Sequence, residues 1–455
     1  MVTVRLQDTL SGELQELCPR DPGKVSIYAC GPTVYGPIHV GNARPFVVFA
    51  LFKRFLEHEG YEVTLVENIT DVNDKIYAAA RDQAVPSAKL AAQMAQTYIA
   101  DTDRLGLGRP DHEPLASQTM AAIVSLIEDL IRSGHAYEAA GDVYFRVRSF
   151  DGYGKLSNRK FDDMEGGEER SELKEDQLDF ALWKAQKEGE DTAWGSPWGL
   201  GRPGWHIEFS AMAEQLLGHN FDIHGGGSDL IFPHHENEIA QTEAARQRPL
   251  AHYWMHNGMV RFGEEKMSKS VGNIRLLSVA LDEYGRDVLI MYFLSAHYRR
   301  PIEYSVSQLE QAASSLERVL NFCRALRGVP AEGAGDWALA YMAKFFATLA
   351  DDFNTPEALA QLFELIGEGN RRLTANEPLG DIRGALLEML TILGLETLLG
   401  EDEQLGVELK ELLERREAAR QAKDFAAADR IRDQVAARGY EIRDSSAGPR
   451  VVRRI

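Results

Sequence analysis

The sequence predicts an α/β protein in which a doubly wound parallel sheet is followed by helical regions. Residues 24–30 (KVSIYAC) and 61–68 (YEVTLVEN) have the apolar content of buried strands, and residues 43–60 between them have the pattern of a helix that ends at Gly60. A Gly- and Pro-rich loop, GPTVYGPIHVGN, follows the first strand. This β-loop-α-β order is typical of nucleotide-binding sheets. From about residue 278 onward the pattern is helical.

The elements after the second strand follow from the same patterns. A helix over residues 117–132 precedes the strand-like AGDVYFRV, and the charged, Gly-rich residues 162–187 indicate an insertion that interrupts the sheet. The segment FDIHGGGSDLIF has strand-then-loop character. Residues 233–247 are expected to form a helix with Pro233 in its first turn. A short strand after Tyr253 then leads into the loop FGEEKMSKSVGN.

Composition indicates a globular protein of several domains, because 455 residues exceed what one core supports and 44% of them are apolar. The longest apolar runs, such as FVVFALF, are far shorter than the roughly 20 residues of a membrane-spanning helix, and no secretory leader pattern is found. We therefore expect a cytoplasmic protein with no membrane partner. Three widely spaced cysteines favour reduced thiols.

The net charge of −20 argues against general coating of nucleic acid, because phosphate affinity comes from Lys and Arg. Residues 405–455 differ from the rest, with 12 Lys and Arg against 9 Asp and Glu, a balance of +3. The other 404 residues therefore carry −23. The C-terminal region is the part best suited to bind a polyanion.

The motif IHVGN places two polar side chains at the predicted start of a helix. His39 and Asn42 are three residues apart, so both face the free backbone N–H groups and the positive end of the helix dipole. This arrangement suits a phosphate group. The alternative is a helix-capping turn with an incidental histidine.

The motif KMSKS, residues 266–270, puts two ammonium groups and two hydroxyls on a Gly-flanked loop. Such a loop can close over the phosphates of a nucleotide and neutralise the charge that develops when pyrophosphate leaves. Alone, a Lys/Ser pentapeptide is usually a solvated loop. Together with IHVGN in one nucleotide-binding fold, it resembles the signature of class I aminoacyl-tRNA synthetases.

Histidines are concentrated in one segment, since seven of the 12 fall between residues 206 and 256. His234 and Glu238 are four residues apart, so on a helix they share one face and can hold one Zn²⁺. The alternative is a helix-surface pair or a core histidine with its hydrogen bonds satisfied. Cys30 ends the first strand beside the nucleotide loop and can supply a third ligand.

The sequence resembles the cysteinyl-tRNA synthetase family over essentially its whole length. The resemblance implies a Rossmann-type catalytic domain split by a connective insertion, with α-helical and anticodon-binding regions after it. The expected boundaries are 1–120 and 201–277 for the catalytic halves, 121–200 for the insertion, 278–335 for a stem-contact region, 336–400 for a helical bundle and 401–455 for the anticodon-binding region. The landmarks that carry the resemblance are YACGPTVYGPIHVGNARPFVVF, NITDVNDKI, LDFALWK, SPWGLGRPGWHIE, DIHGGGSDLIFPHHENEIAQ, YWMHNGMV, EEKMSKSVGN, HYR and DDFNTPEAL.

The resemblance also implies an activity and its partners. The carboxylate of L-cysteine attacks the α-phosphorus of ATP-Mg²⁺, and tRNA(Cys) then takes the acyl group on its 3′-terminal ribose. Members of that family are usually monomers, and the resemblance implies the same here. The protein is expected to position the substrates and to stabilise charge in the transition state rather than to take part in covalent chemistry. The catalytic residues carried over are His39, Asn42, Lys266 and Lys269. The ATP contacts add Gly31, Gly41, Asp229 and Ser268, and the amino-acid pocket takes Thr70, Trp205 and His224.

The zinc site is where this sequence departs from the family. The family holds the substrate thiolate on zinc, and the ligands carried over are Cys30, position 209, His234 and Glu238. The family's GWHIECSAM has cysteine at position 209, whereas this sequence has Phe209. Either Phe209 turns away and three ligands leave a vacancy for the substrate thiolate, or the ring fills the cavity and no metal binds. Ligand count favours weakened zinc binding, because three protein ligands suffice in many open zinc sites.

Three functions stay open on the sequence alone. The first is a cysteine–tRNA ligase. The second is a relative that joins cysteine to a small amine, which the intact 336–455 region disfavours. The third is a paralogue that binds tRNA or an amino acid without activating cysteine, with Phe209 as the mark of lost selection. The intact IHVGN and KMSKS motifs argue for retained ATP chemistry.

Overall fold

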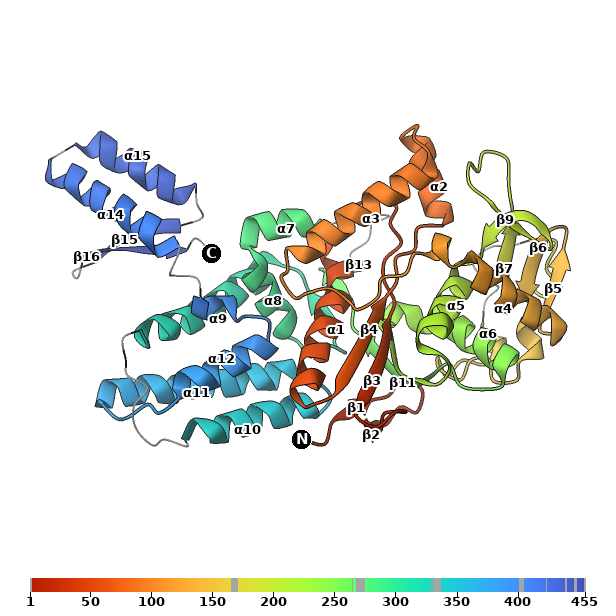
Figure 1. The fold of residues 1–455 in the computed structure, drawn as a ribbon, viewed down its shortest axis with the longest axis horizontal. Helices are drawn as coiled ribbons and strands as arrows, with labels where there is room; N and C mark the ends of the chain where they lie inside the picture. Colours follow the sequence, from red (N-terminus) through yellow and green to blue (C-terminus); the bar gives the residue numbers. More distant parts are fainter. Residues whose placement is uncertain are drawn as a thin grey trace.

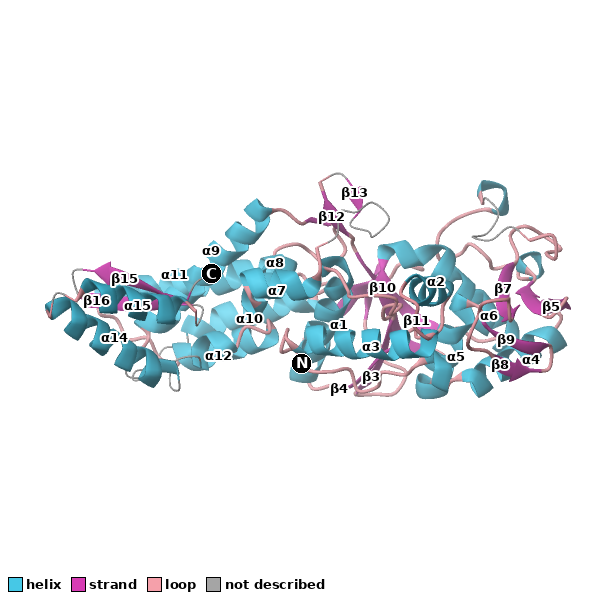
Figure 2. Cartoon of the chain, turned by 90° about the horizontal axis from the view of Figure 1, so that it is seen from above, coloured by secondary structure: helices cyan, strands magenta, loops and turns pink. Residues whose placement is uncertain are grey.

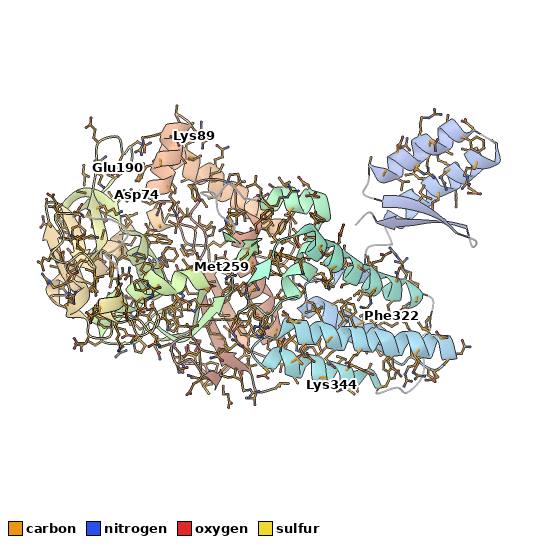
Figure 3. All side chains as sticks on the ribbon, turned by 180° about the vertical axis from the view of Figure 1, so that it is seen from behind. Asp74, Lys89, Glu190, Met259, Phe322 and Lys344 are labelled. Carbon is orange, nitrogen blue, oxygen red and sulfur yellow. The ribbon has the colours of Figure 1, made fainter. Side chains whose placement is uncertain are left out.

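The computed structural model describes residues 2–164, 171–263, 265–266, 275–327, 329, 337–400, 405–422, 424–437, 440–445 and 448–453. The protein is elongated, with the catalytic sheet in the middle, a second sheet at one end and helical units at the other (Figures 1 and 2). Side chains around Glu190 and those around Phe322 lie on opposite sides of this sheet (Figure 3). Within the described residues, no helix is long and apolar enough to cross a membrane.

The central sheet is parallel throughout, in the order β11-β10-β3-β4. Both strands predicted at its start are present, as β3 (Lys24–Ala29) and β4 (Glu62–Glu67). Their neighbours are β10 (Phe221–Gly227) and β11 (Ala251–Asn257). Because all four strands run the same way, their carboxyl ends meet at one edge of the sheet.

The two faces of this sheet are buried in separate cores. In β3, Val25 and Ile27 belong to a core shared with α1 (Val40–His58), whereas Tyr28 belongs to a core shared with α5 (Trp205–Leu217). Alternation along a strand sends successive side chains to opposite faces, so each face needs its own helical cover. Figure 1 shows α1 on one side of the sheet and α5 with α6 on the other. The doubly wound prediction is confirmed.

The insertion forms a sheet of its own, with the order β5-β6-β7-β9-β8 and only antiparallel pairs. The helix predicted over residues 117–132 is present as α4 (Met120–Arg132). The charged stretch 162–187 includes a strand with the fully buried Leu182 and Trp183. The strands are β5 (Ala136–Ala139), β6 (Asp142–Phe145), β7 (Phe180–Ala185), β8 (Trp194–Ser196) and β9 (Gly199–Pro203).

The predicted helix over residues 233–247 is wrong at its start. The backbone of Phe232 is extended (φ −139°, ψ 133°), and the Phe232–Pro233 peptide is cis. The segment Ile231–His235 is therefore kinked at Phe232, and the α-helix α6 spans Glu236–Arg246. Pro233 therefore precedes the α-helix rather than opening it, because an extended residue cannot continue a helical turn.

Helices account for most of the remaining described chain. α2 (Asp74–Asp82) and α3 (Ser87–Asp103) flank the catalytic sheet, and α7 (Leu277–Tyr284) and α8 (Arg286–Leu294) lead to the bundle. The bundle consists of α9 (Val306–Ala325), α10 (Trp337–Ala350), α11 (Thr355–Ala375) and α12 (Ile382–Ile392), followed by α13 (Thr397–Gly400). The C-terminal unit has α14 (Leu405–Gln421), α15 (Phe425–Ala436), β15 (Tyr440–Ser445) and β16 (Gly448–Arg453). Short strands β1 (Arg5–Gln7), β2 (Leu14–Glu16), β12 (Val260–Phe262), β13 (Glu265–Lys266) and β14 (Ile302–Glu303) complete the list.

One buried carboxylate, that of Asp352, joins three parts of the chain. It accepts a hydrogen bond from the Tyr298 hydroxyl (2.6 Å), from Nε of Arg299 (2.6 Å) and from the backbone N–H of Gln7 (3.0 Å). The neighbouring Phe353 packs on Phe52 of α1, with ring centroids 5.2 Å apart. These contacts fasten the bundle to the N-terminal strand and to the segment after α8.

We expect Asp352→Ala to lower stability by roughly 2–4 kcal/mol, because buried donors lose a charged acceptor. Thermal unfolding followed by calorimetry measures this change as a lower transition temperature. Asp351→Ala is the matched control, because Asp351 forms an exposed ion pair with Arg5 and should contribute less than about 1 kcal/mol. Equal shifts in the two variants would contradict the role of Asp352 as the joining residue.

Candidate active site and metal centre

The predicted site residues gather at the carboxyl edge of the central sheet. In β10, His224 pairs with Tyr28 of β3 on one side and with Trp254 of β11 on the other. Cys30 follows β3, and its backbone N–H donates to the carbonyl of Gly225 (2.9 Å). The parallel register thus brings Cys30 beside β10 at the level where ligands bind in open α/β sheets.

The start of α1 is a closed capping box. His39 is the N-cap residue, and its Nδ1 accepts a hydrogen bond from the backbone N–H of Asn42 (3.3 Å). In return, the side-chain oxygen of Asn42 accepts from the backbone N–H of His39 (3.2 Å). A Cβ added to Gly41 would lie 2.9 Å from the His39 ring, so glycine is needed for this geometry. The two side chains predicted to face a phosphate therefore also hold the helix terminus in place.

The second phosphate motif lies mostly outside the described residues, as do its Ser268 and Lys269. Lys266 ends β13, which pairs antiparallel with β12. At the other end of the loop, the backbone N–H of Val40 donates to the carbonyl of Arg275 (2.9 Å). This bond brings the end of the loop against the start of α1.

The segment after β4 runs beside the loop after β3. The backbone N–H of Gly31 donates to the Asn68 side chain (3.0 Å), and a Cβ on Gly31 would lie only 1.7 Å from the Asn68 carbonyl oxygen. Thr70 is fully buried, and its hydroxyl accepts from the Asn68 side chain (3.2 Å). Gly31 and Thr70 are thus positioned together, and only glycine fits at position 31 without a backbone shift.

Four buried side chains place potential metal ligands close together. Among the described residues, one ligand atom from each of Cys30, His224, His235 and Glu238 lies within 4.8 Å of the other three. Cys30 Sγ is 3.1 Å from Nε2 of His235, and Nε2 of His224 is 2.9 Å from Oε2 of Glu238. Nε2 of His235 lies 3.9 Å from Oε1 of Glu238.

His234, the predicted ligand, is not a member of this group. Its Nε2 lies 3.2 Å from Oε1 of Glu238, but its Nδ1 is hydrogen-bonded to Nδ1 of His206 (2.7 Å). Its ring contacts Trp205, with centroids 4.2 Å apart. The prediction that Cys30, His234 and Glu238 bind zinc stays a prediction, because no ligand set is tested directly.

Phe209 is a core residue whose side chain is only 1% exposed. Its ring lies at 89° to that of His234, with centroids 4.4 Å apart, and at 85° to that of Trp205, 6.2 Å away. These are edge-to-face contacts, the favourable geometry for aromatic pairs. Phe209 therefore does not turn away from the pocket but packs against the histidine that the family uses as a ligand.

Burial favours the neutral forms of the Cys30 thiol and the His235 imidazole. Burial raises the pKa of the Cys30 thiol well above its usual value, and the nearby Glu238 adds to the effect. It lowers the pKa of His235 well below its usual value, with His224 as the next cause, and lowers that of His256 to about 3. Burial also raises the pKa of Glu238, against the opposing effect of His224. A bound dication would reverse this balance by stabilising the thiolate and the carboxylate.

Two predicted pocket residues near this cluster have a buried polar atom without a hydrogen-bond partner among the described residues. Nε1 of Trp205 and Nδ1 of His224 are buried without a hydrogen-bond partner among the described residues, as is the Tyr28 hydroxyl. Asp229 is exposed in the short 3-10 helix Ser228–Leu230 that follows β10. Buried polar atoms without a partner are rare in folded proteins and mark places where a ligand can bind.

Sequence reasoning missed His235 and His256 as site residues, although both were counted in the histidine-rich segment. The signal for His256 is its pairing with Gly226 across β10 and β11, which becomes visible only when the sheet register is known. The buried Glu208 was also missed, and both its carboxyl oxygens are without a hydrogen-bond partner among the described residues. Burial raises its pKa well above the usual value, and Asp71 contributes to the shift.

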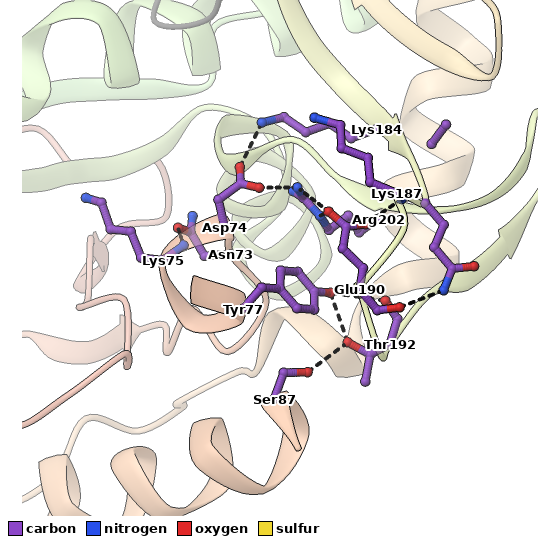
Figure 4. A network of polar contacts seen from close by, with 12 residues as sticks. Asn73, Asp74, Lys75, Tyr77, Ser87, Lys184, Lys187, Glu190, Thr192 and Arg202 are labelled. Carbon is purple, nitrogen blue, oxygen red and sulfur yellow. Dashed lines mark hydrogen bonds and ion pairs between the residues drawn. The ribbon is translucent and has the colours of Figure 1, made fainter. Parts of the chain in front are cut away.

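A cavity of about 710 Å³ opens beside Trp205 and His206, between the central sheet and the insertion. Asp74 at the start of α2 pairs with Lys184 (2.9 Å) and with Arg202, and Arg202 also contacts Glu190 (3.1 Å) (Figure 4). This network ties the insertion to the catalytic unit. Cations that line the cavity are Lys75, Arg159, Lys174, Lys184 and Arg202.

Comparison with known proteins assigns the catalytic unit to a class. Residues 16–314 match the family described as tRNA synthetases class I (C) catalytic domain, so the chain is a class I aminoacyl-tRNA synthetase. Residues 344–398 match the DALR domain, and residues 402–450 match the cysteinyl-tRNA ligase anticodon binding domain. The chain belongs to the cysteinyl-tRNA synthetase family.

Individual relatives agree with this assignment. The cysteine–tRNA ligase of Caldicellulosiruptor saccharolyticus is 44% identical over 99% of this chain and 100% of its own length. That of Halorhodospira halophila is 46% identical, with 98% of each chain covered. Among solved structures, Mycobacterium tuberculosis methionyl-tRNA synthetase in complex with methionyl-adenylate aligns with a TM-score of 0.63 at 15% identity, covering 83% of this chain and 90% of the other. A putative arginyl-tRNA synthetase from Campylobacter jejuni gives 0.54 at 15% identity, covering 83% and 92%. These two likenesses show the class I fold.

We expect Phe209→Cys to slow the release of zinc to a chelator by about tenfold or more, since even outer-shell changes alter metal affinity by roughly 10- to 100-fold. The added thiolate would lie near His234, which the phenyl ring now contacts. Zinc content by atomic emission and release to a colorimetric chelator measure the effect. Phe209→Leu is the control, because it keeps an apolar side chain and offers no ligand. Equal zinc release from both variants would show that position 209 does not reach the metal.

Proposed function

We propose that the protein is a cysteine–tRNA ligase that activates L-cysteine with ATP and transfers it to tRNA(Cys). The observation that carries the proposal is the match of both the catalytic unit, residues 16–314, and the cysteine-specific anticodon unit, residues 402–450, in one chain. Relatives named cysteine–tRNA ligase cover 98–99% of the chain at 44–47% identity, which supports the same substrates.

The first step joins cysteine to AMP. A carboxylate oxygen of cysteine attacks the α-phosphorus of ATP-Mg²⁺, the bond from that phosphorus to the bridging oxygen breaks, and pyrophosphate leaves. The N-terminus of α1 directs backbone N–H groups and the positive end of its dipole at the phosphates. His39 and Asn42 hold this terminus, and Lys266 and Lys269 neutralise the charge that develops on the leaving group.

The nucleotide also needs close approach of the backbone. Gly31 and Gly41 allow the two turns beside the nucleotide to pack against Asn68 and His39 without a clash, and Ser268 adds a hydroxyl. Asp229, in the 3-10 helix that follows β10, is proposed to contact the adenylate. Each of these groups acts by position, because the attacking and leaving groups belong to the substrates.

The amino-acid pocket is proposed to include Thr70 and Trp205. Nε1 of Trp205 is buried without a partner, so it has a donor available for a ligand. Nε2 of His224 is hydrogen-bonded to Oε2 of Glu238 (2.9 Å). This bond fixes the His224 ring beside the pocket. A substrate positioned here has its carboxylate directed to the start of α1, since both features lie at the carboxyl edge of the same sheet.

We propose Zn²⁺ as the resident metal. The fit is supported by the donor chemistry of the cluster, which combines one thiol, imidazoles and a carboxylate, and by Oε1 of Glu238, which is buried without a hydrogen-bond partner. When bound, zinc supplies positive charge that stabilises the buried thiolate and carboxylate. Cys30 and Glu238 are members of the predicted ligand set and of the group that the fold brings together.

The second step moves the cysteinyl group to tRNA. The ribose hydroxyl attacks the carbonyl carbon of the adenylate, its proton is lost, and AMP leaves. The cavity beside Trp205 is lined by five cationic side chains and by the carboxylates of Asp74 and Asp163, and this excess of positive charge suits the negatively charged acceptor end. The basic C-terminal region, with its balance of +3, suits the anticodon arm. We further infer that the protein acts as a monomer in the cytoplasm. Size-exclusion chromatography with light scattering measures the oligomeric state and so tests the monomer.

The activity is tested by amino-acid-dependent exchange between ATP and labelled pyrophosphate, followed by acylation of tRNA(Cys). We expect exchange with cysteine and charging of tRNA(Cys). Exchange with cysteine but no transfer to tRNA(Cys) would favour a different acceptor, such as a small amine. No exchange with any amino acid would overturn the proposal and leave a tRNA- or amino-acid-binding protein.

We expect Lys266→Ala to lower the rate of exchange by about 100-fold or more, because removal of one group that stabilises transition-state charge costs roughly 10²–10³ in kcat. The Km for cysteine should change little. Lys89→Ala, at an exposed position on α3 (Figure 3), is the control and should exchange at the wild-type rate. A wild-type rate in Lys266→Ala would remove Lys266 from the proposed machinery.

A further inference from the structure

We propose that the cavity between the central sheet and the insertion holds the unpaired 3′ end of the tRNA, with its terminal adenine stacked on the guanidinium of Arg159, which itself lies on the ring of Phe232. The inference rests on the proposed function for the identity of the substrate. It deepens that function, because it assigns the side chains that recognise the terminal base during transfer and that take no part in the activation of cysteine.

The cavity has the size and the position that this end of the tRNA requires. Its volume of about 710 Å³ lies within the roughly 300–1,000 Å³ of ligand pockets. Thr33, in the loop after β3, and Trp205, at the start of α5, line it from the catalytic unit, and Arg159 lines it from the insertion. A nucleotide bound in this cavity is therefore adjacent to the proposed amino-acid pocket, which its ribose hydroxyl must reach.

Arg159 and Phe232 form a flat pair on which a base can stack. The guanidinium carbon of Arg159 lies 4.4 Å from the centroid of the Phe232 ring, which is the arrangement of a cation–π pair. Phe232 is half-buried, whereas Arg159 is exposed and lines the cavity, so its guanidinium is accessible to a ligand there. Proteins bind unpaired bases by stacking them on guanidinium planes and on aromatic rings, because every base has a flat π-face.

The Phe232 ring is held in place by a contact between the insertion and the catalytic unit. The ring of Tyr153, in the insertion, meets Phe232 edge to face, with centroids 6.4 Å apart. The Tyr153 hydroxyl donates to the side-chain oxygen of Asn237 in α6 (2.5 Å). The ring under the guanidinium is therefore positioned before any tRNA binds.

The loop that carries Arg159 is also fastened. The backbone N–H of Arg159 donates to the carbonyl of Gly154 (3.1 Å), whose φ is +95°. A Cβ on Gly154 would lie 2.1 Å from the Arg159 carbonyl oxygen, so only glycine allows the loop to close. Within the loop, the backbone N–H and the hydroxyl of Ser157 both donate to the fully buried carboxylate of Glu236 (2.8 Å each), the first residue of α6. The loop is thereby joined to the segment that carries Phe232.

The cations of the cavity suit the phosphates of a single-stranded end. Asp74 pairs with Lys184 and Arg202, whereas Lys75 is directed away from this network (Figure 4). Lys75 lines the cavity from α2, and Lys174 lines it from the insertion. Because phosphates follow one another along a strand, cations on both sides of the cavity can contact successive nucleotides.

The difference between stacking and charge supplies the first test. Arg159→Lys keeps the positive charge and removes the flat guanidinium. We expect it to slow the transfer of cysteine from the preformed adenylate to tRNA(Cys) by about tenfold or more, because the stacking of one base contributes roughly that factor. Pyrophosphate exchange, which uses no tRNA, should keep its rate. Lys160→Ala, which removes an exposed cation at the next position, is the matched control and should change neither step. A wild-type rate of transfer in Arg159→Lys would overturn the proposal.

A modified tRNA tests the site in the wild-type protein, even if the variant fails to fold. A tRNA(Cys) whose terminal nucleotide keeps its ribose but has no base should accept cysteine about tenfold or more slowly than the intact tRNA. Arg159→Lys should slow this transfer no further, because the base that stacks on the guanidinium is absent. Equal transfer to the two tRNAs by the wild type, or losses that multiply in the variant, would overturn the proposal.

The failure of this inference differs from the failure of the proposed function. Light-induced cross-linking of tRNA(Cys) that ends in 8-azidoadenosine locates the terminal base without any reaction of cysteine. Cross-links to the loop of Arg159 or to the segment of Phe232, with no pyrophosphate exchange in the wild type, would keep the site and reject the function. Exchange with cysteine and cross-links only elsewhere would keep the function and reject the site. A raised Km for ATP in Arg159→Lys, with transfer unchanged, would place the adenine of ATP in the cavity and also overturn the proposal.

Discussion

The burial of Glu238 is the constraint on which the site depends. Its carboxylate is fully enclosed at the start of α6, within reach of His224, His234 and His235. An isolated carboxylate in such a place is strongly unfavourable and must be paired, protonated or bound to a metal. Burial raises the pKa of Glu238 and lowers those of His234 and His235, which disfavours a positive charge on these two imidazoles. The proposed zinc ion would satisfy the carboxylate, and it would account for the ligand-type side chains that converge on it.

The rest of the molecule positions this centre against the nucleotide site. The parallel register sets Cys30 and His224 side by side, and the capping box at His39 fixes the start of α1 at the same edge of the sheet. Arg44 of α1 is fully buried, and it donates to the carbonyl of Gly258 (2.5 Å) after β11. Asp352 then joins the helical bundle to the catalytic unit. The candidate active centre and the helical bundle are thus joined through the catalytic unit.

The sequence predicted the fold well because its signals were local. Apolar runs identified β3 and β4, the spacing of His39 and Asn42 marked the start of α1, and the order of motifs indicated the family. The metal centre was harder, because it depends on backbone geometry that spacing does not reveal. The predicted closeness of His234 and Glu238 is present, with Nε2 of His234 3.2 Å from Oε1 of Glu238. Spacing did not reveal that the next residue, His235, also reaches Cys30 (3.1 Å), because that contact depends on how the chain enters α6 after the extended Phe232. Whether Phe209 turned away or packed inward depended on its neighbours Trp205 and His234, which only the tertiary structure brings together.

The central proposal is that a bound zinc ion balances the buried carboxylate of Glu238. Its most direct test is an anomalous difference map measured at the zinc edge on crystals of the wild-type protein. The account predicts one peak at bonding distance from Cys30 Sγ and from a carboxylate oxygen of Glu238. The absence of any peak in this cluster would contradict the account.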